Sequence, residues 1–128
     1  MESREFKPFG SVSALTLGGG GIGNVWGETS KEESIASVHL ALESGIDHLD
    51  VAPMYGKGEA ERVVGEAIKE RSRDSFRLTT KCALGSMPDE EVYDRFNTSL
   101  IRSLDTLGTD YVDLFLCLLY TSDAADDP

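Results

Sequence analysis

Three titratable side chains stand where predicted strands of the sequence end, and together they could carry proton chemistry. Asp50 lies at the end of the apolar run 46–51, Tyr55 follows in the next loop, and Lys81 ends the run 76–81. Neighbouring parallel strands lie about 4.8 Å apart, so an acid and a lysine that end two such strands can pair if both point to the same side. A lysine next to Tyr55 would stabilise its phenolate, and the phenol could then donate a proton near neutral pH. This combination allows the reduction of a carbonyl group.

The elements that would position these side chains alternate along the chain. Apolar runs predict strands over residues 14–17, 46–51, 76–81 and 111–116. Amphipathic stretches predict helices from Ser30 to about residue 44, over about 59–70 and over about 88–107. This alternation is typical of a parallel α/β fold and amounts to about three and a half β/α units. The carboxyl ends of such strands are where α/β barrels and open sheets place their active sites.

Local signals define the ends and the inward faces of the predicted helices. Ser30 and Glu33 form a capping box, and Gly45 and Gly108 are predicted to end the first and third helices. Apolar residues spaced by three and four mark the faces that should be buried. They are Ile35, Val38, Ala41 and Leu42 in the first helix, Val63, Val64, Ala67 and Ile68 in the second, and Val92, Phe96, Leu100, Leu104 and Leu107 in the third.

The composition argues against several classes of partner. Among 128 residues, 23 acidic against 12 basic side chains give a formal net charge of -11, which disfavours a nucleic acid or an anionic membrane. The sequence has neither an apolar run of about 18 residues nor a signal-peptide pattern, so we expect a cytoplasmic protein. Cys82 and Cys117 lack the spacing of a zinc site or a disulfide framework and are predicted to be buried free thiols. No metal site is expected.

The glycine-rich run that follows the first predicted strand invites a second interpretation. Gly18, Gly20 and Gly23 satisfy the G-x-G-x-x-G pattern of a Rossmann dinucleotide site. In that fold the helix opens at the glycines, whereas here residues 24–29 intervene before the capping box. The context therefore favours a flexible loop over a Rossmann fingerprint.

Five stretches of the sequence, taken together and in this order, resemble the aldo-keto reductase family. They fall within the region of resemblance, about residues 5–116, and read GIDHLDVAPMYG at 45–56, GEAERVVG at 58–65, TTK at 79–81, SLIRSL at 99–104 and TDYVDL at 109–114. The resemblance implies an incomplete (β/α)8 TIM barrel, of which the chain holds the first three and a half units. It also implies NADPH as cofactor and a catalytic group of Asp, Tyr, Lys and His.

Carried over by position, the resemblance gives each candidate residue a role. It implies Asp50 as the acid that pairs with the lysine, Tyr55 as the general acid that protonates the carbonyl oxygen, and Lys81 as the cation that assists it. The glycine-rich run becomes the first barrel loop, whose backbone lies near the nicotinamide, so Gly20 and Gly21 together with Asp50 are the expected NADP(H) contacts. The implied substrate is a small aldehyde or ketone, which the sequence does not specify further.

Four features outside this group have a structural and a functional interpretation. His48 shares the strand parity of Asp50 and is expected to point into the barrel as a structural histidine. Trp26 could line a substrate pocket or pack on the glycine-rich loop. Lys57 and Arg62 could contact the cofactor or the solvent, which the sequence leaves open. The acids Glu59 and Glu61 are expected as charges at a helix N-terminus, where the helix macrodipole favours them.

The end of the sequence departs from the family pattern. The family places its histidine where this chain has Leu118, and residues 118–128 have neither a strand nor a helix period. We therefore predict that residues 1–117 are the N-terminal part of a barrel domain that is truncated, and that residues 118–128 are a non-family tail, artefactual or disordered. The resemblance to translated adapter sequence favours an artefact. Such a fragment alone is expected to be inactive.

A rival from another functional class is a barrel that has lost catalysis and serves as an interaction or redox-sensor protein. In that case Asp50 and Lys81 would be an ion pair with no catalytic duty. The presence of Tyr55 beside them in the same motif favours an enzyme.

Overall fold

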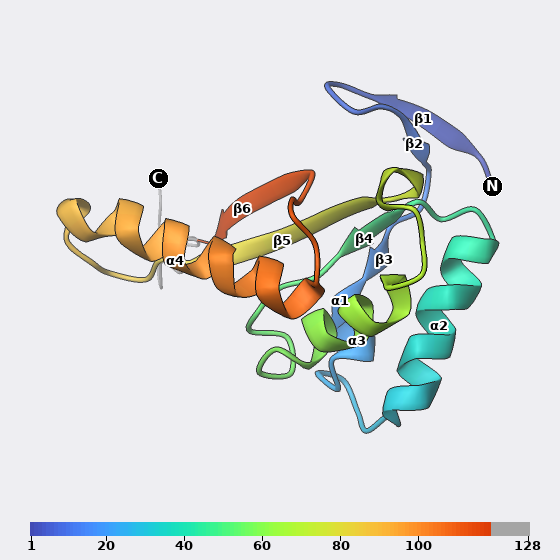
Figure 1. Ribbon diagram of the computed structural model, residues 1–128, viewed down its shortest axis with the longest axis horizontal. Helices are drawn as coiled ribbons and strands as arrows, with labels where there is room; N and C mark the ends of the chain where they lie inside the picture. Colours follow the sequence, from blue (N-terminus) through green and yellow to red (C-terminus); the bar gives the residue numbers. More distant parts are fainter. Residues whose placement is uncertain (119–128) are drawn as a thin grey trace, which may run out of the picture.

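A four-stranded parallel sheet forms the centre of the computed structural model, in which residues 1–118 are described (Figure 1). The strands follow one another in chain order, β3-β4-β5-β6, and every neighbouring pair is parallel. Their bounds are Leu17–Gly18 for β3, His48–Asp50 for β4, Arg77–Ala83 for β5 and Leu114–Leu118 for β6. The predicted parallel α/β architecture is confirmed.

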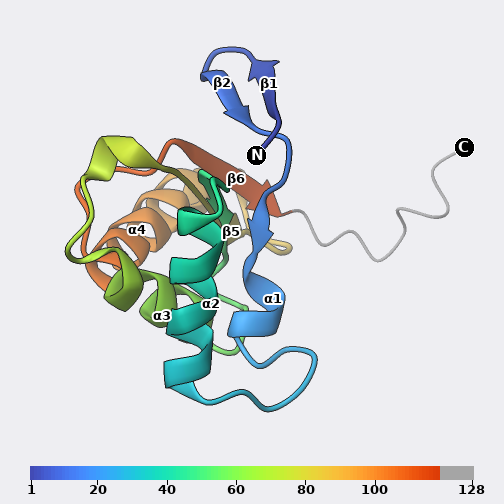
Figure 2. The same cartoon turned by 90° about the vertical axis from the view of Figure 1, so that its right-hand side faces the viewer.

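The three long helices connect these strands and lie on one face of the sheet, as Figures 1 and 2 show from two directions. They are Lys31–Glu43 (α2), Glu59–Ile68 (α3) and Asp89–Leu107 (α4), and the short 3-10 helix Arg73–Ser75 (η1) precedes β5. A doubly wound sheet has helices on both faces, whereas successive units of a barrel keep them on the outside. The one-sided arrangement is that of a barrel segment.

The helix ends follow the predicted local signals. The Ser30 side chain accepts a hydrogen bond from the Glu33 backbone, and the Glu33 carboxylate accepts one from the Ser30 backbone, so the predicted capping box is present. Gly45 and Gly108 have φ angles of 85° and 65°, a conformation in which a residue with a Cβ is strained. Both helices therefore end at the glycines that the sequence indicates.

An N-terminal hairpin, Ser3–Phe6 (β1) and Gly10–Ser13 (β2), was not predicted. Its first strand is exposed throughout and so lacks the apolar alternation that reveals a half-buried strand. The hairpin, which projects from the domain in Figure 2, is tied to the amino ends of the sheet strands. The Ser13 backbone donates to Asp47 Oδ1 at 2.8 Å, and Arg77 donates to the Phe9 carbonyl at 3.0 Å.

Two predictions about the first strand and its loop are wrong. The strand expected at 14–17 is the shorter β3, and the glycine-rich run expected as a loop contains a helical turn, Gly19–Ile22 (α1). The absence of a side chain at Gly19 allows this turn to form, because a Cβ on Gly19 would lie 2.9 Å from Val51 Cγ1. The glycines let α1 pack directly against the residue that follows β4.

The last described strand begins later than its apolar sequence suggests. Residues 111–113 precede β6, and two of them, Tyr111 and Asp113, pack on Arg73. Its guanidinium lies 3.9 Å from the Tyr111 ring centroid and 2.6 Å from the Asp113 carboxylate. Leu118, which we predicted to begin the tail, is the last residue of β6. The remainder of the predicted tail lies outside the described residues.

The cysteine prediction holds for one thiol only. Cys82 is buried, but its partner in the β5–β6 register, Cys117, is exposed. Cys117 lies on the edge strand of the described sheet, where few elements cover it.

Within residues 1–118, no helix combines the length and the apolarity needed to cross a membrane.

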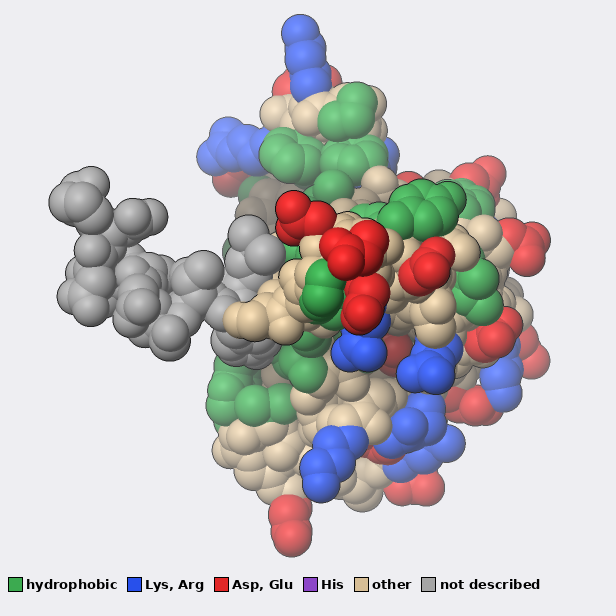
Figure 3. Space-filling view, turned by 90° about the vertical axis from the view of Figure 1, so that its left-hand side faces the viewer, with side chains coloured by type: hydrophobic (Ala, Val, Ile, Leu, Met, Phe, Trp, Pro, Cys, Tyr) green, Lys and Arg blue, Asp and Glu red, His purple; other side chains and the backbone are tan. Residues whose placement is uncertain are grey.

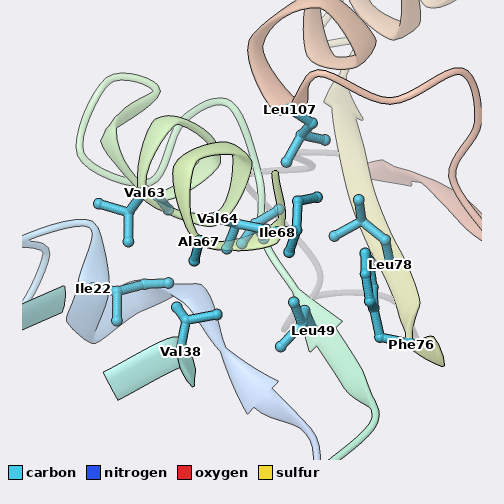
Figure 4. Packing of buried hydrophobic residues seen from close by; sticks show 12 residues of the cluster. Ile22, Val38, Leu49, Val63, Val64, Ala67, Ile68, Phe76, Leu78 and Leu107 are labelled. Atoms are coloured by element: carbon cyan, nitrogen blue, oxygen red, sulfur yellow. The ribbon is translucent and has the colours of Figure 1, made fainter. Parts of the chain in front are cut away.

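The hydrophobic core lies between the helices and the sheet (Figure 4). Leu49 and Leu78 point from β4 and β5 toward Val63, Val64 and Ala67 of α3. All the inward residues that we predicted for α3 are buried. In α4 only Leu107 of the five predicted residues is fully buried, while the other four are half-buried.

A single glycine sets how closely α3 and α4 approach each other. A Cβ on Gly65 would lie 2.6 Å from the Thr106 carbonyl oxygen and 3.1 Å from Leu107 Cα. Both atoms belong to the backbone and cannot move aside as a flexible side chain would.

We expect Gly65→Ala to lower the free energy of unfolding by about 1–3 kcal/mol, the usual cost of overpacking a close contact. Gly21→Ala is the matched control, because Gly21 is also helical and the nearest atom to its added Cβ is 4.0 Å away. Urea denaturation followed by circular dichroism measures both. Equal stability of the two variants would show that α3 and α4 can separate without loss.

Candidate active site

Alternation along the strands divides their side chains between two environments. Leu49, Leu78 and Val51 belong to the core under the helices. Successive side chains of a strand point to opposite faces, so Asp50 and Lys81 lie on the face away from the helices. In a barrel this face is the interior, and both residues lie at or near the carboxyl ends of their strands.

The predicted pair of Asp50 and Lys81 forms. The Lys81 ammonium donates to Asp50 Oδ1 and, at 2.9 Å, to the Val51 carbonyl oxygen. The Lys81 side chain is only 7% exposed, whereas that of Asp50 is 36% exposed. A buried ammonium needs hydrogen-bonding partners of this kind, and the Asp50 carboxylate keeps an accessible side toward the strand-end surface.

Tyr55 lies beside this pair, in the loop that follows β4. The Lys81 ammonium is 4.9 Å from the centroid of the Tyr55 ring. The lysine thus approaches the face of the ring, while its hydrogen bonds go to Asp50 and Val51. Among residues 1–118 we find no hydrogen bond from the phenolic hydroxyl, which leaves this group available to a ligand.

The glycine-rich turn lies against the same residues. A Cβ on Gly19 would be 3.2 Å from Tyr55 Cδ2, and one on Gly20 would be 2.9 Å from the Trp26 ring. Gly21 is exposed, and only the edge of Trp26 comes as near as 4.0 Å to its built Cβ. Of the two predicted cofactor contacts in this turn, Gly20 is therefore covered by an indole ring and Gly21 faces open space.

Trp26 packs on the glycine-rich turn and also remains accessible. It covers Gly20, yet 80% of its surface is exposed. The packing is one of the two interpretations that the sequence left open.

Two loops interlock next to Tyr55. A Cβ on Gly56 would lie 1.8 Å from the Gly23 carbonyl oxygen, and one on Gly23 would lie 3.1 Å from the Tyr55 backbone. Gly56 also has a φ angle of 61°, which favours glycine. The backbone of the Tyr55 loop is thus seated directly on the backbone of the glycine-rich turn.

His48 lies on the same sheet face as Asp50 and bridges β5 and the residue that precedes β3. Its Nε2 is 2.7 Å from Thr79 Oγ1, and its Nδ1 is 3.1 Å from Thr16 Oγ1. These contacts agree with the predicted structural role. Burial lowers the pKa of His48 below its usual value, and the Arg77 guanidinium adds to this shift. Three neighbouring carboxylates oppose it, those of Asp50, Asp47 and Asp113.

The structure shows the surroundings of two charged groups near the site. Glu61 lies in the first turn of α3, as predicted, and it is buried there and accepts a hydrogen bond of 2.6 Å from Thr80 Oγ1. Arg62 donates to Glu59 and to the Lys57 carbonyl, so it folds back on its own loop. Helical spacing alone could have shown that Glu61 lies next to the inward Val64. Within the described chain, no group of three or more potential ligands could hold a metal ion.

The family comparison follows this geometry. Residues 14–118 match the Aldo/keto reductase family, and the chain belongs to that family. It is 40% identical over 111 residues to the aldo-keto reductase YhdN of Bacillus subtilis, and the aligned region covers 81% of this chain and 33% of the relative. It is 32% identical over 119 residues to the NADH-specific methylglyoxal reductase of Escherichia coli, and that alignment covers 82% of this chain and 36% of the relative.

Solved structures agree with the fold. An aldo-keto reductase from Klebsiella pneumoniae in complex with NADPH superposes with a TM-score of 0.76 at 28% identity, covering 91% of this chain and 38% of that one. The holo form of an aldo-keto reductase from Bacillus halodurans gives 0.76 at 28% identity, covering 98% and 43%. The predicted fold, an incomplete TIM barrel, is confirmed. The chain spans about a third of the length of the curated relatives it matches.

The shifted pKa of His48 predicts how stability depends on pH. The folded protein binds this proton less readily than the unfolded chain, so His48 contributes stability above its ordinary pKa of 6.5. That contribution is lost as the pH falls through the lower folded-state pKa. Urea denaturation at pH 7.5 and at pH values down to about 5 should show a loss of stability for the wild type that is smaller for His48→Gln. An equal loss in both would assign the pH dependence to other groups.

Proposed function

We propose that the protein containing this chain reduces an aldehyde or ketone to an alcohol with NADPH as the hydride donor. The observation that carries the proposal is the contact of a buried, paired lysine with the ring of an available tyrosine at the carboxyl ends of parallel strands. Membership in the aldo-keto reductase family supports it. NADPH is favoured by the Klebsiella pneumoniae complex, although the Escherichia coli relative is NADH-specific.

Each of the three side chains would have one task. Hydride addition to the carbonyl carbon builds negative charge on the carbonyl oxygen, and Tyr55 would protonate that oxygen. The Lys81 ammonium would stabilise the phenolate that remains after the transfer. Asp50 would hold the ammonium in place, because its carboxylate accepts a hydrogen bond from it. Proton and hydride together convert the carbonyl to the alcohol.

The nicotinamide ring would lie over the strand-end surface beside Gly18. Nothing lies within 4 Å of a Cβ built on Gly18, and Gly18 is the register partner of Asp50 on the neighbouring strand. The accessible side of the Asp50 carboxylate could accept hydrogen bonds there, and the exposed backbone of Gly21 lies in the following turn. When bound, the cofactor supplies the hydride. The residues described here would hold its nicotinamide end.

Tyr55→Phe in the full-length gene product tests the proton donor. It removes the hydroxyl and keeps the ring over Lys81, so we expect kcat to fall about 10²- to 10⁴-fold, the range that general acid catalysis contributes. NADPH affinity should stay nearly unchanged. Steady-state oxidation of NADPH with an aromatic aldehyde and a fluorescence titration of the cofactor measure the two quantities.

Tyr93→Phe is the matched control, because Tyr93 lies on α4 and is 75% exposed. It should leave both quantities unchanged. Retention of a tenth or more of the wild-type kcat by Tyr55→Phe would remove Tyr55 from the role of general acid. Tight NADPH binding without turnover of any carbonyl by the wild type would favour the redox-sensor alternative.

A double mutant tests whether Lys81 acts through Tyr55. Lys81→Met removes the charge that stabilises the phenolate, so it should also lower kcat and shift the pH profile of reduction. If both residues serve one proton transfer, the double mutant loses little more than the worse single mutant. Strictly multiplicative losses would mean that Lys81 acts on another group. Far-ultraviolet circular dichroism verifies that each variant is folded.

A further inference from the structure

A groove between α3 and α4 collects cationic side chains on the helix side of the sheet. It has a volume of about 440 Å³ and runs from the loop after β4 along the facing sides of the two helices. Figure 3 shows Lys and Arg side chains gathered on this side of the molecule, next to a cluster of acids. The cations that line the groove are Lys57, Arg62, Arg95 and Arg102.

Most of these cations lack an ion-pair partner. Arg62 pairs with Glu59 at 3.0 Å, whereas Lys57, Arg95 and Arg102 form no ion pair with any of residues 1–118. The sequence contains 23 acidic residues against 12 basic ones, so carboxylates are abundant. Four cations around one groove, three of them without a carboxylate partner, therefore point to an external anion.

An unused hydroxyl on the wall of the groove points the same way. Ser103 is 1% exposed, and its Oγ has no hydrogen-bond partner within the described residues. Buried hydroxyls are rarely left without a partner. Ser103 lines the groove together with Thr98 and Ser99 of the same helix.

One carboxylate also lines the groove and supplies the rival explanation. Glu61 is 2% exposed and accepts the hydrogen bond from Thr80 Oγ1. The cations could serve only to offset this buried charge. Arg62 is already paired with Glu59, so Glu61 stands against three unpaired cations; positive charge is still in excess, and the Ser103 hydroxyl remains without a partner within the described residues.

We propose that the α3–α4 groove binds the phosphate group of a small phosphorylated metabolite. Arg95 and Arg102 would hold the phosphate oxygens, since guanidinium groups match phosphate geometry with paired hydrogen bonds. Pro53 and Met54 would contact the organic part of the ligand. A phosphate, with up to two charges and several acceptor oxygens, suits four cations and a free hydroxyl better than a carboxylate does. The volume is within the usual range for small-molecule sites.

Calorimetric titration of the full-length gene product with phenyl phosphate tests the site. Saturating NADP⁺ is present, so that the ligand cannot bind where cofactor phosphates would. We expect saturable binding of one phenyl phosphate per chain that weakens at least about tenfold in Arg95→Gln/Arg102→Gln. Ser103→Ala should weaken it severalfold and leave the melting temperature of the ligand-free protein unchanged, because its hydroxyl has no partner to lose.

Arg4→Gln/Lys7→Gln is the matched control. It removes the same two charges from the N-terminal hairpin and its turn, far from the groove, and should leave the affinity unchanged. An equal loss in this control would mean that only the net charge matters, which overturns the proposal. The absence of saturable binding would also overturn the proposal, and this is the result expected if the cations only neutralise the charge of Glu61. Binding of benzoate as tight as that of phenyl phosphate would overturn it too.

The outcome is separable from that of the proposed carbonyl reduction. The groove shares no lining residue with the group of Asp50, Tyr55 and Lys81, so Tyr55→Phe should bind phenyl phosphate like the wild type. If NADP⁺ itself does not bind, the same titration without it still compares the groove variants with the hairpin control.

Discussion

The buried ammonium of Lys81 constrains the architecture around the strand ends. A lysine can be 7% exposed only where other groups replace its water, and two do so here, the Asp50 carboxylate and the Val51 carbonyl. Asp50 ends β4, and Val51 is the first residue after it. Satisfying this one cation therefore fixes the register of β4 against β5 and the direction in which the next loop departs. That loop carries Tyr55, so the electrostatic requirement also determines where the phenol lies.

The parallel sheet separates this requirement from the packing of the core. Along β5, Leu78 lies in the hydrophobic cluster, and Lys81, three residues later, lies on the opposite face. The helices can thus pack at close distance, as they do at Gly65, without any change on the other face. Charged groups therefore lie on both faces of the sheet near the strand ends. Only the backbone of the strands separates these two environments.

Strong local signals made much of the fold predictable. The capping box at Ser30, the glycines 45 and 108 and the apolar faces of α2 and α3 each depend on neighbours in sequence, and each is present. The pairing of Asp50 with Lys81 could also be predicted, because strand ends of successive β/α units meet at one edge. Errors arose where distant contacts decide. The helical turn of α1 depends on the approach of Val51, and the late start of β6 depends on Arg73 binding Tyr111 and Asp113.

The seating of Gly56 on the Gly23 carbonyl has an evolutionary consequence. Neither loop can lengthen or acquire a side chain at this point without displacing the other, since the two backbones already touch. The loops at the carboxyl ends of the strands should therefore differ in how freely their lengths change during evolution. The first two loops are expected to keep their length while other loops vary, so new substrate ranges would arise by insertion elsewhere and leave the position of the phenol intact.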